Sequence, residues 1–134
     1  MLLLPKRSKH KKVKKGKLKK FEFKSNTLKF GTVGLKAKES GIISARQIES
    51  ARQAIVRKIN RKGKLWVRIF PDLPVTNKPK EVRMGKGKGS VAFWSTRVSG
   101  GKMLFEMCGV AKATSLLAFR TGGAKLPIKT KVVF

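Results

Sequence analysis

The segment EVRMGKGKGS, residues 81–90, has the residue types and spacing most suggestive of chemistry. Three glycines, Gly85, Gly87 and Gly89, alternate with Lys86 and Lys88. Such a loop can cradle the phosphates of a bound nucleotide. It can equally bring its backbone close to a large polyanion, because alternate positions lack bulky side chains and the lysines are free to reach phosphates.

The spacing of the glycines argues against a nucleotide site. A phosphate-binding Walker loop requires G-x-x-x-x-G-K-[ST] ahead of a helix, whereas strand-like VAFW follows here. A dinucleotide fingerprint requires glycine where Ser90 stands. The polyanion interpretation therefore remains, with an ordinary flexible basic loop as the alternative. The residues assigned to this loop are Arg83, Met84, Gly85, Lys86, Gly87, Lys88 and Gly89.

The charge of the chain favours a polyanion partner. Its 134 residues include 34 Lys and Arg against 6 Asp and Glu, a formal net charge of +28. Nucleic acid, an anionic membrane and an acidic protein are the candidate partners. We favour nucleic acid, because the charge is spread along the chain and no segment approaches the roughly 20 apolar residues that span a bilayer.

Enzyme chemistry finds little support in the sequence. The single histidine, His10, lies in a lysine-rich stretch, and the single cysteine, Cys108, is interpreted as a small core residue. No Cys/His cluster predicts a metal site, and we expect no cofactor or small-molecule substrate. The six acids are scattered and form no paired-carboxylate motif: Glu22, Glu39, Glu49, Asp72, Glu81 and Glu106.

Residues 1–24 are predicted to be a basic arm, ahead of a single domain at 25–134. The first 20 residues contain ten Lys or Arg and no acid, and blocks of like charge usually stay disordered until a partner neutralises them. We expect the arm to order on RNA; the alternative is a solvated tail that aids solubility. Its proposed RNA contacts are Lys6, Arg7, Lys9, Lys11, Lys12, Lys14 and Lys15.

An amphipathic helix is predicted between Ser44 and Gly63. Ser44 and Gln47 form a capping-box pattern, and Gly63 is placed to end the helix. The face opposite the apolar stripe carries Arg46, Arg57 and Arg61, which predicts a helix lying along phosphates; a merely solvated face is the alternative. The apolar stripe comprises Ala45, Ile48, Ala51, Ile55, Val56 and Ile59.

The remaining elements predict an α+β fold, a mixed and largely antiparallel sheet covered by two helices. One or two strands are expected within 21–40, with Leu28 and Phe30 on one face, and another at 64–70, where Arg68 is a further candidate RNA contact. Prolines make 71–82 an extended connection. Strands at 91–98 and 102–110 are expected to form a hairpin through Ser99, Gly100 and Gly101. A short helix at 111–120 should break at Gly122 and Gly123, before a last strand within 126–134. Trp66 and Trp94 are assigned to the core rather than to base stacking.

Several of these segments occur together in one known family. The run SARQIESARQAIVRKINRKGKLWVRIFPDLPVTNKPKEVRMGKGKGSVAFW, with MLLLPKR, FGTVGLKA, LFEMCGV and AKLPIKT, resembles bacterial-type large-subunit ribosomal protein sixteen. The resemblance implies an α+β, non-enzymatic protein that binds large-subunit rRNA late in assembly. It also implies a place beside neighbouring ribosomal proteins, between the central protuberance and the peptidyl-transferase region, near the elbow of A-site tRNA. A free basic nucleic-acid-binding or RNA-chaperone protein is the alternative function.

The resemblance gives the loop and the arm expected positions. It implies that Arg83–Gly89 points toward the functional centre and that the arm lies among rRNA helices. The excess of lysine, 25 Lys against 9 Arg, and the absence of a recognisable presequence favour a mitochondrially encoded protein. Plastid and bacterial cytoplasmic origins are the alternatives.

Overall fold

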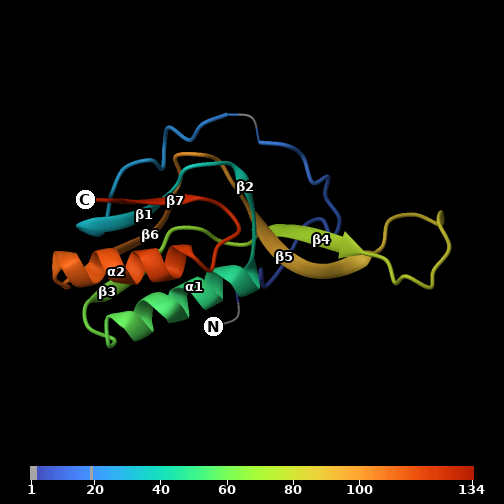
Figure 1. The fold of residues 1–134 in the computed structure, drawn as a ribbon. Helices are drawn as coiled ribbons and strands as arrows, with labels where there is room; N and C mark the ends of the chain where they lie inside the picture. Colours follow the sequence, from blue (N-terminus) through green and yellow to red (C-terminus); the bar gives the residue numbers. More distant parts are fainter. Residues whose placement is uncertain (1–2, 19) are drawn as a thin grey trace.

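The computed structural model describes residues 3–18 and 20–134, and it contains two antiparallel sheets and two helices (Figure 1). The larger sheet has the order β3-β6-β1-β7, formed by Lys64–Val67, Met103–Cys108, Val33–Ala37 and Thr130–Val133. The smaller has the order β2-β5-β4, formed by Gly41–Ser44, Ser90–Val98 and Leu73–Asn77. The α+β prediction is confirmed, although the strands divide between two sheets rather than forming one.

Helix α1 spans Ala45–Lys58, and its amino end is the capping box that the sequence predicted. The backbone N–H of Gln47 donates to Ser44 Oγ, and the backbone N–H of Ser44 donates to Gln47 Oε1. The carboxyl end differs from the prediction, because Ile59 is the cap and Asn60 and Arg61 take left-handed backbone angles. Gly63 also has a positive φ, but it turns the chain into β3 rather than ending the helix.

Helix α2 spans Lys112–Gly123, so the expected break at Gly122 and Gly123 is wrong. Both glycines are buried and serve close packing. A Cβ on Gly122 would lie 2.5 Å from Ile55 Cγ1, and a Cβ on Gly123 would lie 2.5 Å from Thr130 Oγ1. Tertiary contacts therefore override the low helix propensity of glycine at these two positions.

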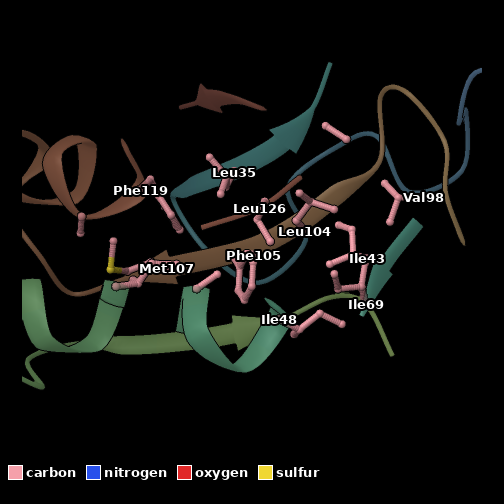
Figure 2. Packing of buried hydrophobic residues seen from close by; sticks show 14 of the residues in the cluster. Leu35, Ile43, Ile48, Ile69, Val98, Leu104, Phe105, Met107, Phe119 and Leu126 are labelled. Atoms are coloured by element: carbon pink, nitrogen blue, oxygen red, sulfur yellow. The ribbon is translucent and has the colours of Figure 1, made fainter. Parts of the chain in front are cut away.

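The core lies between the two helices and the larger sheet. Figure 2 shows Ile48 beneath β6, with Leu35 and Phe119 on the other side of the cluster. Ile48, Ala51 and Ile55 of α1 are fully buried, whereas Val56 and Ala45, also assigned to the apolar stripe, are only partly buried. Figure 1 shows α1 and α2 side by side on one face of the larger sheet, with the chain before β1 on the other side.

The predicted hairpin between β5 and β6 is wrong, because the two strands belong to different sheets. The turn between them instead forms backbone hydrogen bonds with other parts of the chain. Gly101 N–H donates to Ala37 O, and Gly100 O accepts from Glu22 N–H at 2.9 Å. A glycine-rich turn thus carries the chain from one sheet to the next.

Two other strand assignments needed correction. Residues 71–82 contain strand β4, in which Pro74 pairs with Trp94; the strand lies at the sheet edge, where a missing N–H is tolerated. The strand expected within 21–40 begins only at Val33, so Leu28 and Phe30 lie in irregular chain ahead of it. The last strand, β7, is confirmed in the predicted interval.

We expect Gly122→Ala to lower the free energy of unfolding by about 1–2 kcal/mol, since overpacking against Ile55 exceeds the gain in helix propensity. Urea unfolding measures the change. Thr114→Ala, at an exposed position of α2, is the matched control and should be neutral or slightly stabilising. Adding Ile55→Ala should make the cost of Gly122→Ala smaller. A cost that is identical with and without Ile55 would contradict the packing explanation.

Candidate nucleic-acid interface

Arg68 is the one proposed RNA contact whose charge is engaged inside the protein. It follows β3, its side chain is 13% exposed, and its Nη1 is ion-paired with Glu106 Oε1. Its guanidinium also lies over the ring of Phe30, 5.0 Å from the centroid. This placement explains Arg68 without RNA, and an RNA contact by this residue stays a prediction.

Glu106 is fully buried in β6, and its other carboxylate oxygen accepts three backbone N–H groups. The donors are Lys29, Phe30 and Gly31, at 3.1, 2.6 and 2.9 Å from Oε2. Burial raises the pKa of Glu106. The three backbone donors and the charge of Arg68 together lower the pKa by more than burial raises it, so it lies below the ordinary value of 4.5. The carboxylate is thus held ionised in the interior.

Glu106 was not among the site residues predicted from the sequence. The available signal was a single acid within the otherwise apolar strand MLFEMC. A charged residue is almost never fully buried unless it is paired, so that position predicts a partner elsewhere in the chain. The sequence could not identify the partner as Arg68, which lies 38 residues away.

The loop of residues 78–89 joins β4 to β5 and projects away from both sheets, at the right of Figure 1. Residues 79–88 are all exposed, and Met84 is 95% exposed. Gly85 and Gly87 have φ angles of 95° and 81°, and a Cβ on either would meet no atom within 4 Å. These glycines therefore set the backbone shape of the loop and serve no packing within the protein.

Arg83, Lys86 and Lys88 are exposed in this loop, as the sequence predicted. Lys86 takes a left-handed φ of 53° between the two glycines. The loop also contacts the arm, because Lys12 Nζ donates to Lys88 O at 2.6 Å and Lys88 Nζ donates to Val13 O at 2.7 Å. One basic surface thus runs from the arm onto the loop.

The described residues of the arm form no helix or strand. Leu3 is buried against the core cluster, and Pro5 and Glu22 are half-buried. The seven proposed RNA contacts of the arm are all exposed: Lys6, Arg7, Lys9, Lys11, Lys12, Lys14 and Lys15. On α1, Arg46 and Arg57 are exposed as well, and Arg61 is exposed in the turn that follows.

Few cations of this protein are neutralised by its own acids. Among residues 3–18 and 20–134, the ion pairs are Arg68 with Glu106 and Arg52 with Glu49. Glu22 and Glu39 accept hydrogen bonds from the backbone N–H groups of Lys24 and Lys129. The arm, the loop and the exposed face of α1 therefore keep their positive charge for an external partner.

The two tryptophans are half-buried, so their assignment to the core is wrong. Trp66 stacks on Phe30 at 6.0 Å, with Lys64 Nζ 5.1 Å from its ring centroid. Trp94 lines an open cavity with Leu4. Cys108, assigned to the core, is also only half-buried, at the end of β6.

The described part of the chain contains neither a side-chain cluster suited to a metal nor a helix that could cross a membrane.

Comparison with known proteins decides the family. Residues 5–133 match the sequence pattern described as "Ribosomal protein L16p/L10e". The chain belongs to the ribosomal protein L16p/L10e family. The match covers the arm, both sheets and the projecting loop, and it confirms the resemblance seen in the sequence. Proteins of the L16p/L10e family are structural and not enzymes.

Curated relatives of this L16p/L10e protein carry the name "Large ribosomal subunit protein uL16". The relative from Erythrobacter litoralis is 52% identical over 98% of this chain and 92% of its own length. Those from Zymomonas mobilis and Bartonella henselae are 54% and 52% identical over 98% of this chain, covering 92% and 96% of their own lengths. These relatives are bacterial, which fits the bacterial alternative and gives the predicted mitochondrial location no support.

Glu106→Gln should lower the free energy of unfolding by about 3–5 kcal/mol, because it leaves Arg68 half-buried without its counter-charge and weakens the bonds to residues 29–31. Glu49→Gln, which breaks the more exposed pair with Arg52, is the matched control and should cost less than about 1 kcal/mol. Urea unfolding at neutral pH measures both. Equal costs would contradict the role given to Glu106.

The same pair of variants tests the pH dependence. Because the folded pKa of Glu106 lies below 4.5, its contribution to stability is full above that pH and is lost as the pH falls toward the folded pKa. The wild type and Glu49→Gln should therefore lose stability below about pH 4.5, and Glu106→Gln should lose less.

Proposed function

We propose that this protein is a structural component of the large ribosomal subunit that binds large-subunit rRNA through its exposed cations. Family membership over nearly the whole chain is the observation that carries the proposal. The uncompensated charge of the arm and of α1 supplies the mechanism, since lysines and arginines that contact phosphates release bound counterions. Neighbouring ribosomal proteins are its further partners.

We further propose that the loop Arg83–Gly89 works at the A-site tRNA path near the peptidyl-transferase region. Its projection, its exposed Arg83, Lys86 and Lys88, and glycines that serve no internal packing suit a segment shaped for an RNA outside the protein. Arg83 can present a planar fork to a phosphate or a guanine edge. The buried core cluster includes no residue of the loop.

We also propose a mitochondrial location, which the excess of lysine and the similarity of the segment RVSGGKMLFEM to plant mitochondrial members of the family support. The subunit would then be that of an organelle ribosome of bacterial type. Imaging of a tagged copy in its source cell, beside a matrix marker, tests this location; a cytoplasmic or plastid signal would contradict it.

Sedimentation of a tagged copy through a high-salt gradient, with crosslinking to identify its RNA, tests the function. Co-migration with the large subunit at one copy per particle, crosslinked to large-subunit rRNA, is the expected result. A salt-labile smear over many RNAs or over DNA would indicate a free nucleic-acid-binding protein and contradict the proposal.

Replacing Lys6, Arg7, Lys11, Lys12, Lys14 and Lys15 with alanine should weaken binding to an rRNA fragment and flatten its salt dependence. If each contacts one phosphate, the slope of log K against log salt should shrink by about 4–5. A charge-preserving variant with arginine at the five lysines should keep the wild-type slope. An alanine variant with the wild-type slope would exclude the arm from the RNA contact.

Arg83→Gln should leave the unfolding free energy within about 0.5 kcal/mol of wild type, because the residue is exposed and lies in a projecting loop. We expect normal affinity for the rRNA fragment but slower tRNA accommodation or subunit maturation. Lys80→Gln, exposed in the same loop, is the control. Translation rates and subunit profiles like those of wild type would remove Arg83 from the proposed site.

A further inference from the structure

An open cavity of about 620 Å³ is formed by β1 and β7 of the larger sheet, the chain before β1 and the turn at Gly101. Lys36 of β1, Lys131 of β7, and Phe21 and Phe23 from the preceding chain line it. Its volume is within the range of about 300–1,000 Å³ that holds small organic molecules. None of these residues is among the RNA contacts proposed above.

The backbone around the cavity is fixed by hydrogen bonds. Glu22 N–H donates to Gly100 O at 2.9 Å, and Met103 N–H donates to Ser25 O at 2.8 Å. Gly100 also provides the seat for Phe21, because a Cβ there would come within 3.1 Å of its ring. The segment that carries the two phenylalanines is therefore tied to the turn between β5 and β6.

Both phenylalanine rings lie at the surface despite this anchoring. Phe21 is 68% exposed and Phe23 is 83% exposed. Exposure of an apolar ring to water is energetically unfavourable. Two exposed rings on one wall of a cavity therefore offer flat surfaces to a partner. Nucleobases stack on such rings, and single-stranded RNA is commonly bound in this way.

The floor of the cavity carries two lysines, and the one acid in the lining, Glu22, accepts the backbone N–H of Lys24 and is ion-paired with neither. Lys36 and Lys131 are directly opposite each other in the β1–β7 pairing. Directly opposed like charges destabilise a sheet, and their Cβ atoms are only about 4.5–5.5 Å apart. Lys36 Nζ donates to Asn26 Oδ1 at 2.9 Å, a neutral acceptor, and the ion pairs of the described residues involve neither lysine.

We propose that this cavity binds one unpaired nucleotide of the RNA, with its base on Phe23, the more exposed ring, and its phosphate between Lys36 and Lys131. The inference rests on the proposed rRNA binding and adds a base-stacking site that uses none of the lysines and arginines proposed as RNA contacts in the arm and the loop. An acidic segment of a neighbouring protein would satisfy the lysines, but it would have no use for two exposed rings.

Binding of the full chain to a short oligouridylate, and to a strand of the same length without bases, tests the proposal. Phe23→Ala should weaken oligouridylate binding roughly five- to a hundredfold, leave its salt slope unchanged and leave binding of the abasic strand unchanged. Phe23→Leu should behave like Phe23→Ala, because leucine keeps the apolar character and loses the flat face. Phe23→Trp should restore binding.

Phe134→Ala is the matched control for loss of an exposed ring, since Phe134 is 51% exposed and lies outside the cavity. Lys131→Gln should reduce the salt slope by about 0.7, equivalent to one phosphate contact. It should also raise the melting temperature of the RNA-free protein by roughly 1–5 °C, because it relieves repulsion with Lys36. Lys125→Gln, at an exposed position outside the sheet, should not raise it.

The outcomes separate this inference from the proposed function. If wild type binds RNA with a steep salt dependence and Phe23→Ala binds both strands as wild type does, the cavity holds no nucleotide and the rRNA-binding proposal stands. An acidic peptide whose binding requires Phe23, with RNA binding unaffected, would likewise overturn the inference. If wild type binds no RNA, both proposals fall.

Discussion

The buried carboxylate of Glu106 holds the chain ahead of β1 against the larger sheet. One oxygen accepts the N–H groups of three successive residues, 29–31, and the other pairs with Arg68. The chain ahead of β1 is thereby attached to the sheet without forming a strand. A buried ion pair contributes little net stability relative to an apolar packing, but it fixes one arrangement of the groups that it joins. Here that arrangement holds residues 29–31 against β6.

The small number of acidic residues also determines the charge of the protein surface. Glu106 and Glu49 are each paired with an arginine, so the described cations of the arm, the loop and the outer face of α1 face solvent uncompensated. Within the free protein these charges repel one another, and contact with a polyanion removes that cost. The fold is thus a scaffold whose full stability is expected only in the particle that neutralises it.

Local patterns in the sequence predicted the local structure well. The capping box of Ser44 and Gln47, helix α1 and the exposed glycine-lysine loop follow from neighbouring residues, and the family could be recognised from its motifs. Long-range pairing was less predictable. Alternation identified β5 and β6 as strands but could not assign them to different sheets, and the burial of Glu106 depends on residues that are distant in sequence. Pro74 made a strand at 73–77 hard to predict as well, because only the pairing with β5 shows that this strand lies at a sheet edge, where proline is tolerated.

The glycines show why the functional site is harder to predict from the sequence than the fold is. Gly122 and Gly123 looked like helix breakers, yet neighbouring side chains occupy the space where their Cβ atoms would be, so the core explains them. Gly85 and Gly87 have no neighbour within that space, so their positive φ angles and not close packing explain why they are glycine. The two glycines thus shape a loop whose outer surface is left open, and this open surface is what the proposed RNA contact requires.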